Sequence, residues 1–185
     1  MLNLNKNNLF SKKTEGDYSA IEVARLLLSY DPQRKYFKEG KMTSRSEADN
    51  PPIIGNFRLN KMLHICYMLY YSKYGKPLFW ENLRAYPRGA IVYKVLMNFI
   101  QLSREKLSPE QILIKEKDKK FISQTYYYFK NNSDQELEDF SHDDIAWEER
   151  SKSEDDDDRM IINQKTKNFY RDVLRHIVNE AELNE

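Results

Sequence analysis

Hydrophobic residues recur at helical spacing along much of this 185-residue chain. The strongest pattern lies in residues 57–74, where the apolar stripe consists of Leu59, Met62, Leu63, Cys66, Tyr67 and Tyr70. Gly75 and Pro77 follow at the positions where a helix cap and a helix stop are expected. A helix this apolar must lie inside the core, so the sequence predicts that the other helices pack around residues 57–74.

Other segments show shorter helical patterns. Ser19 and Glu22 have the spacing of a capping box at the start of a helix that ends before residues 31–32, an Asp-Pro pair, and Ser133 and Glu136 repeat that spacing. Apolar residues at helical spacing also occupy 90–102, 121–129 and 162–177, and a short helix is expected around Trp147. Residues 78–86 are expected to be extended, before Pro87 and the following glycine interrupt them. The predicted fold class is mainly α: a compact bundle of about six helices with at most one small β-hairpin.

The polar segments suggest the domain organisation. Residues 1–16 are rich in asparagine and lysine and are expected to form a flexible tail, followed by a single helical domain over residues 17–180. Within that domain, residues 31–55 contain two adjacent prolines and no sustained period, which predicts a long surface connection. Residues 151–158 form an acidic run, which is expected to be a solvated loop.

Charge and cysteine content narrow the functional classes. The chain has 30 Lys and Arg against 29 Asp and Glu, and a formal charge of +1 does not favour a nucleic-acid partner. A single cysteine, Cys66, excludes an intrachain disulfide and fits a reducing compartment. No apolar run approaches the roughly 18–20 residues that span a bilayer, and the amino-terminal residues do not resemble a secretion signal. We therefore expect a cytoplasmic protein without a membrane partner.

Few residues suggest metal or catalytic chemistry. His64 and Cys66 are two positions apart on the central helix, so they point to different sides and are expected to be core residues. His142, Asp143 and Asp144 form a dense histidine–carboxylate cluster, which would need a further ligand to bind a metal. The favoured interpretation is that one of these groups caps the helix that carries Trp147. Because the common catalytic motifs are absent, the sequence predicts no enzyme, no catalytic residue, no metal site and no cofactor.

The aromatic content is high, with 13 tyrosines and nine phenylalanines. Tyr126, Tyr127 and Tyr128 are consecutive, so their rings cannot all be buried on one face of a helix. Exposed tyrosines beside lysines could stack on bases, and they could equally form a protein interface. The near-neutral charge favours protein, with simple core packing ahead of both. The neighbouring lysines are Lys119, Lys120 and Lys130.

Four segments together resemble the Panacea domain, the SocA-like or GepA-like family of phage-associated antitoxins. They are residues 59–67, 75–79, 85–92 and 137–147, and the overall resemblance covers about residues 18–170. The matching positions are Leu59, Lys61, Leu63, Tyr67, Gly75, Pro77, Leu78, Gly89, His142 and Trp147. The glycine–proline segment and the late histidine–tryptophan segment, in matched order and separation, carry most of the specificity.

The resemblance implies a compact helical domain that neutralises a toxin by direct binding, with no catalytic residues. Some members of the family are thought to act as adaptors that present the toxin to a protease. The partner would be a cognate toxin that is encoded nearby. The aromatic excess suggests where it would bind: the exposed members of Tyr126, Tyr127 and Tyr128, with Trp80, Tyr86 and Arg88 around the turn. Two alternatives remain, a nucleic-acid-binding regulator and a metal-dependent hydrolase that uses His142 with Asp143 or Asp144.

Overall fold

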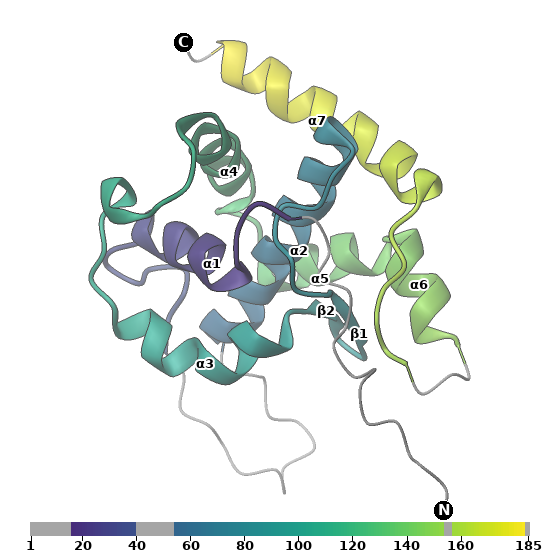
Figure 1. The fold of residues 1–185 in the computed structure, drawn as a ribbon, viewed down its shortest axis with the longest axis horizontal. Coiled ribbons are helices and arrows are strands. Elements are labelled where there is room, and N and C mark those ends of the chain that lie inside the picture. Colours follow the sequence, from purple (N-terminus) through teal and green to yellow (C-terminus); the bar gives the residue numbers. More distant parts are fainter. Residues whose placement is uncertain (1–15, 40–53, 154–156, 184–185) are drawn as a thin grey trace, which may run out of the picture.

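The computed structural model describes residues 16–39, 54–153 and 157–183. These residues form a mainly α fold with one two-stranded antiparallel hairpin, as predicted (Figure 1). The described part contains seven α-helices, one more than expected, and one short 3-10 helix, η1. The elements in chain order are α1 (Ala20–Ser29), α2 (Ile54–Tyr74), β1 (Arg84–Tyr86), β2 (Gly89–Ile91), α3 (Tyr93–Arg104), η1 (Pro109–Gln111), α4 (Glu116–Phe129), α5 (Asp134–His142), α6 (Ile145–Ser151) and α7 (Gln164–Leu183).

Helix α2 is the centre of the core. Every residue from 57 to 70 is buried, which confirms the prediction that this segment is the central helix. Helices α1, α3 and α4 lie on one side of α2, and α6 and α7 lie on the other (Figure 1). A helix that is covered on all sides must also bury its polar residues, and each buried polar group needs a hydrogen-bond partner.

Two of these polar residues show how α2 positions its neighbours. Arg58 donates to Asp134 at the start of α5 over 2.6 Å, and to backbone carbonyls of the loop before α5. Asn60 accepts a hydrogen bond of 2.9 Å from the backbone N–H of Val92, which precedes α3. Hydrogen bonds to α2 side chains therefore hold the beginnings of both α5 and α3.

The hairpin begins later in the chain than the sequence suggested. Strands β1 and β2 pair antiparallel, and Pro87 and Arg88 form the turn between them. Gly89 has a φ of +93°, in the left-handed region that favours glycine, and a β-carbon there would collide with the Lys61 ammonium. Because β2 occupies residues 89–91, α3 begins at Tyr93 instead of residue 90. Both predicted capping boxes, at Ser19 and Ser133, are present.

The predicted connection over residues 31–55 is only partly a surface feature. The carboxylate of Asp31 accepts hydrogen bonds from the backbone N–H groups of Lys35, Tyr36 and Phe37 at 2.8–2.9 Å. This arrangement turns the chain and buries the ring of Phe37, which is 1% exposed. The first part of the connection thus belongs to the core, and residues 40–53 lie outside the described part.

The other two predicted polar segments are also only partly covered. Of the tail, residues 1–15 lie outside the described part. Of the acidic run, Ser151 ends α6 and residues 154–156 are not described. Asp158 pairs with Arg84 of β1 at 2.7 Å, so the end of the run contacts the hairpin instead of being purely solvated.

Candidate partner-binding site

The six predicted partner-binding residues lie in two separate regions. Tyr86 and Arg88 belong to the hairpin, and Trp80 precedes it in the chain. The three tyrosines of residues 126–128 are on α4, on the other side of α2 (Figure 1). The structure therefore does not bring them together into one aromatic patch.

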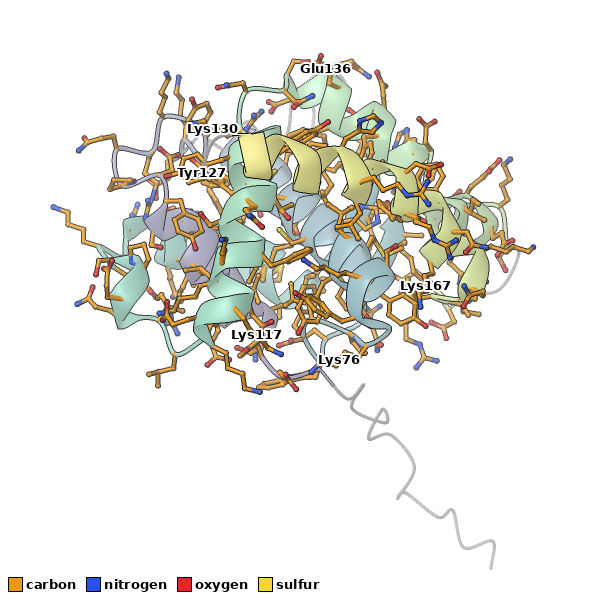
Figure 2. All side chains as sticks on the ribbon, turned by 90° about the horizontal axis from the view of Figure 1, so that it is seen from above. Lys76, Lys117, Tyr127, Lys130, Glu136 and Lys167 are labelled. Carbon is orange, nitrogen blue, oxygen red and sulfur yellow. The ribbon has the colours of Figure 1, made fainter. Side chains whose placement is uncertain are left out.

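The α4 region offers few rings to a partner. Tyr126 is only 2% exposed and packs against Tyr30 and Phe37, with ring centroids 5.5 and 6.1 Å apart, so it is a core residue and is not among the exposed tyrosines of residues 126–128. Tyr127 is 52% exposed, and the Lys130 ammonium lies 4.5 Å from its ring centroid. Figure 2 shows these two side chains together at the same end of α4. Since Tyr128 is half-buried, α4 presents a single exposed tyrosine.

In the hairpin region, the turn is held from two sides. The guanidinium of Arg88 donates to both carboxylate oxygens of Glu138 on α5, at 2.8 and 3.1 Å. The indole Nε1 of Trp147 on α6 donates to the Tyr86 carbonyl at 3.0 Å. The ring of His142 stacks on that indole, with centroids 4.1 Å apart and planes 10° from parallel. Burial is the main cause that lowers the pKa of His142.

Lys61 lies directly beneath this turn. Its residue is 1% exposed, and its ammonium donates to the Arg88 carbonyl. No carboxylate forms an ion pair with Lys61 within the described residues. Burial therefore lowers its pKa to about 7, although the charge of Glu138 opposes the shift. Lys61, which is one of the positions that match the family, thus connects α2 to the hairpin turn through this hydrogen bond.

Two hollows flank the start of α3. One has a volume of about 280 Å³ and a mostly apolar lining that includes Phe57, Pro87, Ile91 and Leu96. Tyr86 and Arg88 also line it. The second hollow, of about 290 Å³, is lined by residues that include Trp80, Val92 and Tyr93. The predicted partner-binding residues Trp80, Tyr86 and Arg88 therefore all lie next to α3.

Helix α3 itself is apolar on two faces. Val95, Phe99 and Leu102 point into the core and are buried. On the opposite side, Tyr93 is 50%, Met97 66% and Ile100 42% exposed, and Leu96 between them is half-buried. We call Tyr93, Leu96, Met97 and Ile100 the α3 outer face.

The sequence analysis missed this surface. The pattern over residues 90–102 was taken as a single apolar stripe, and Tyr93 and Met97 were not considered. A signal was present, because positions 93, 96, 97 and 100 themselves follow the i, i+3, i+4, i+7 spacing of one helix face. A second apolar stripe on one short helix indicates a second packing partner.

A buried polar cluster lies on the other side of α2. The Oδ2 atom of Asp144 accepts hydrogen bonds from His64 Nε2 and from the Tyr170 hydroxyl, both at 2.7 Å. Its Oδ1 atom accepts from the backbone N–H of Ala146 at 2.7 Å, which confirms that one of the three clustered groups caps the helix of Trp147 and shows that it is Asp144. All three side chains are fully buried. Burial alone would raise the pKa of Asp144, but these hydrogen bonds outweigh it and hold the pKa below its ordinary value.

This cluster has the residue types of a catalytic site, but its side chains are fully buried and a substrate cannot reach them. The sequence analysis did not pair His64 with Asp144, because 80 positions separate them. His142, the histidine of the cluster predicted from the sequence, stacks on Trp147 instead. Within the described residues, no three His, Cys, Asp or Glu side chains gather as metal ligands. Cys66 is also fully buried, which raises the pKa of its thiol.

The comparisons with known proteins bear on this arrangement. Among the described helices, none combines the length and apolar content that a bilayer crossing needs. No match was found among curated proteins or among solved structures. Residues 59–148 match the family model described as antitoxin SocA-like, Panacea domain. That range contains most of α2, the hairpin, α3 to α5 and the first half of α6. Over residues 59–148, just under half of its length, the chain is thus similar to the Panacea domain of SocA-like antitoxins.

Proposed function

We propose that this protein is a cytoplasmic antitoxin that neutralises a toxin by binding it directly. The observation that carries the proposal is the Panacea-domain match, which covers both the central helix and the hairpin–α3 region. The proposed partner is a toxin protein encoded next to this gene.

The mechanism that we infer is occlusion. A stable complex covers about 800 Å² on each partner, usually with an apolar centre and a polar rim. The hairpin–α3 region offers such a combination, since Trp80 and Tyr86 lie beside the α3 outer face and the charged Arg88 is at the edge. The toxin would be inactive because its working surface is covered.

The arrangement of His64, His142 and Asp144 fits a binding protein better than an enzyme. Asp144 and the Nε2 atom of His64 are hydrogen-bonded in the interior, where both side chains are fully buried and a substrate has no access. The ring of His142 is occupied by its stack on Trp147. These groups support the packing of α2, α5 and α6, which is the role expected of polar groups in a binding domain.

Co-expression with the neighbouring gene tests the proposal. Induction of the neighbour alone should stop growth, and simultaneous expression of this protein should restore it, with the two proteins purifying as a complex. If growth is not restored and no complex forms, the proposed function is wrong. The toxin's half-life in strains with and without the housekeeping proteases separates the mechanisms: occlusion leaves the half-life unchanged or longer, and an adaptor shortens it.

A further inference from the structure

We propose that the α3 outer face is the docking surface for an apolar segment of the toxin that is flanked by carboxylates. This inference rests on the proposed function and assigns its binding surface to particular residues. It places the centre of the complex on α3 and not on the tyrosines of α4.

The first argument is that the fold does not need these apolar side chains. The inner face of α3 already supplies its contribution to the core through Val95, Phe99 and Leu102. Met97 remains 66% exposed, and Tyr93 remains 50% exposed. Contiguous apolar patches on otherwise polar surfaces commonly mark interaction sites.

The second argument is shape. Leu96 belongs to the outer face and also lines the 280 Å³ hollow, so the apolar surface continues from the helix into a depression. The hollow is bounded on its far side by Phe57 and by Pro87 of the hairpin turn. Side chains that anchor an interface usually insert into such pockets near its centre.

The third argument is charge. Helix α3 contains Lys94 and Arg104 and no acidic residue, and Arg88 lies at the edge of the hollow. The ammonium of Lys94 lies 3.6 Å from Glu81, too far for a hydrogen bond, and its side chain is 57% exposed. Arg104 uses one nitrogen in its pair with Glu39, and Arg88 uses two in its pair with Glu138. These cations retain unused donors, and carboxylates on a partner would complement them.

The same charges disfavour two other occupants. In a symmetric dimer formed through this face, identical surfaces would meet and bring the lysines and arginines of the two copies together. Within this chain, residues 1–15 contain three lysines and one glutamate, so their charge has the same sign as the α3 rim. Residues 40–53 contain only two large apolar side chains, Met42 and Ile53, to fill the hollow.

Thiol labelling of the full chain tests the assignment. In the Met97→Cys variant, the introduced thiol should react quickly with a maleimide. Cys66 is buried and should react slowly, and labelling of the parent protein gives the rate of this background reaction. Saturation with the purified toxin should slow labelling at position 97 by at least about tenfold, since water is excluded from an interface centre. The matched control is Leu113→Cys, because Leu113 is 87% exposed and lies outside the face. Its labelling rate should not change.

Three outcomes would overturn the assignment. Equal labelling of position 97 with and without toxin, in a complex that does form, means that the toxin binds elsewhere. Slow labelling of position 97 in the free protein at every concentration means that the chain's own residues cover the face. Labelling that slows as the free protein is concentrated means that a second copy occupies it.

Substitutions separate this inference from the proposed function. Met97→Glu should weaken toxin binding by about thirtyfold or more, whereas Leu113→Glu adds the same charge elsewhere and should bind as the parent does. Lys94→Glu should slow association by about tenfold at low salt, with Lys152→Glu, directly after α6, as its control. If the parent neutralises the toxin and Met97→Glu does so equally well, the function stands and the α3 assignment fails. If the parent itself does not bind, the proposed function fails first.

Discussion

The buried cluster around Asp144 and the α3 outer face both reverse the usual distribution of side chains. The cluster places a histidine and a carboxylate in the interior, and the outer face places a methionine and an isoleucine in water. In the cluster, Asp144 accepts hydrogen bonds from two side chains and from the backbone at the start of α6, so the fold accounts for its burial. On α3, no described contact accounts for the exposed apolar residues.

This difference between the cluster and the outer face shows which residues serve the fold and which are candidates for binding a partner. A histidine beside an aspartate looks catalytic in the sequence, and an apolar residue on a helix looks structural. In three dimensions the polar cluster stabilises the fold, and the apolar residues are available to a partner. Accessibility, and not residue type, decides which group can act on another molecule.

The largest expected effect comes from breaking the polar cluster. Asp144→Ala should lower the free energy of unfolding by about 3–5 kcal/mol, because it removes a helix cap and leaves His64 and Tyr170 buried without their acceptor. Urea denaturation followed by circular dichroism measures this loss. Asp143→Ala is the control, since Asp143 is exposed and its loss should change stability by less than about 0.5 kcal/mol. Similar values for the two variants would contradict the structural role of the cluster.

Lys61 provides a test in which pH is the variable. Its pKa is about 7 in the folded protein, against an ordinary value of 10.5. Between these values the unfolded chain keeps the proton that the folded protein has lost, so stability should rise with pH. The expected slope from Lys61 is about 1 kcal/mol per pH unit between pH 7 and 9.5. Below pH 7 both states carry the proton, and Lys61 contributes no slope.

The Lys61→Met variant should lack this rise, because methionine does not titrate. Denaturation curves of both proteins at half-unit steps of pH give the comparison, and subtraction removes the contribution of other groups. Parallel stability profiles would show that the Lys61 ammonium keeps its charge beneath the hairpin turn.

Removing a single tyrosine hydroxyl from the Asp144 cluster and from the α3 outer face compares the two regions directly. Tyr170→Phe removes the 2.7 Å hydrogen bond to Asp144 and should cost about 2 kcal/mol, since hydrogen bonds to charged groups are the stronger ones. Tyr93→Phe removes the hydroxyl of a half-exposed ring on α3 and should cost less than about 0.5 kcal/mol. Thermal unfolding measures both, and an equal loss in the two variants would contradict the distinction.

The smallest effect on stability is expected on the α3 outer face. Met97→Ser should change the free energy of unfolding by less than about 0.5 kcal/mol, because Met97 is mostly exposed and packs little. The matched inner variant, Phe99→Ala, should cost about 3–5 kcal/mol, since it opens a cavity in the core. A large loss in Met97→Ser would mean that the outer face serves the fold.

Much of the fold could be predicted because its causes are local. The stripe from Leu59 to Tyr70, the capping boxes at Ser19 and Ser133 and the cap at Asp144 depend on residues a few positions apart. The hairpin was displaced in the prediction because Pro87 was taken as an end, and in the structure it belongs to the turn. Sequence alone could not show that Lys61 and Ser141 crowd Gly89 from two distant helices.

The sequence by itself determined the helical class, the central helix and the similarity to the Panacea domain, because periodicity and short motifs record which side chains face the core. Only the tertiary structure decided which polar residues are paired and which apolar residues stay in water. Pairing and exposure depend on contacts between segments far apart in the chain, such as His64 with Asp144, and on the absence of a described neighbour over Met97. Such contacts leave no regular spacing in the sequence, so they become visible only when the helices are packed.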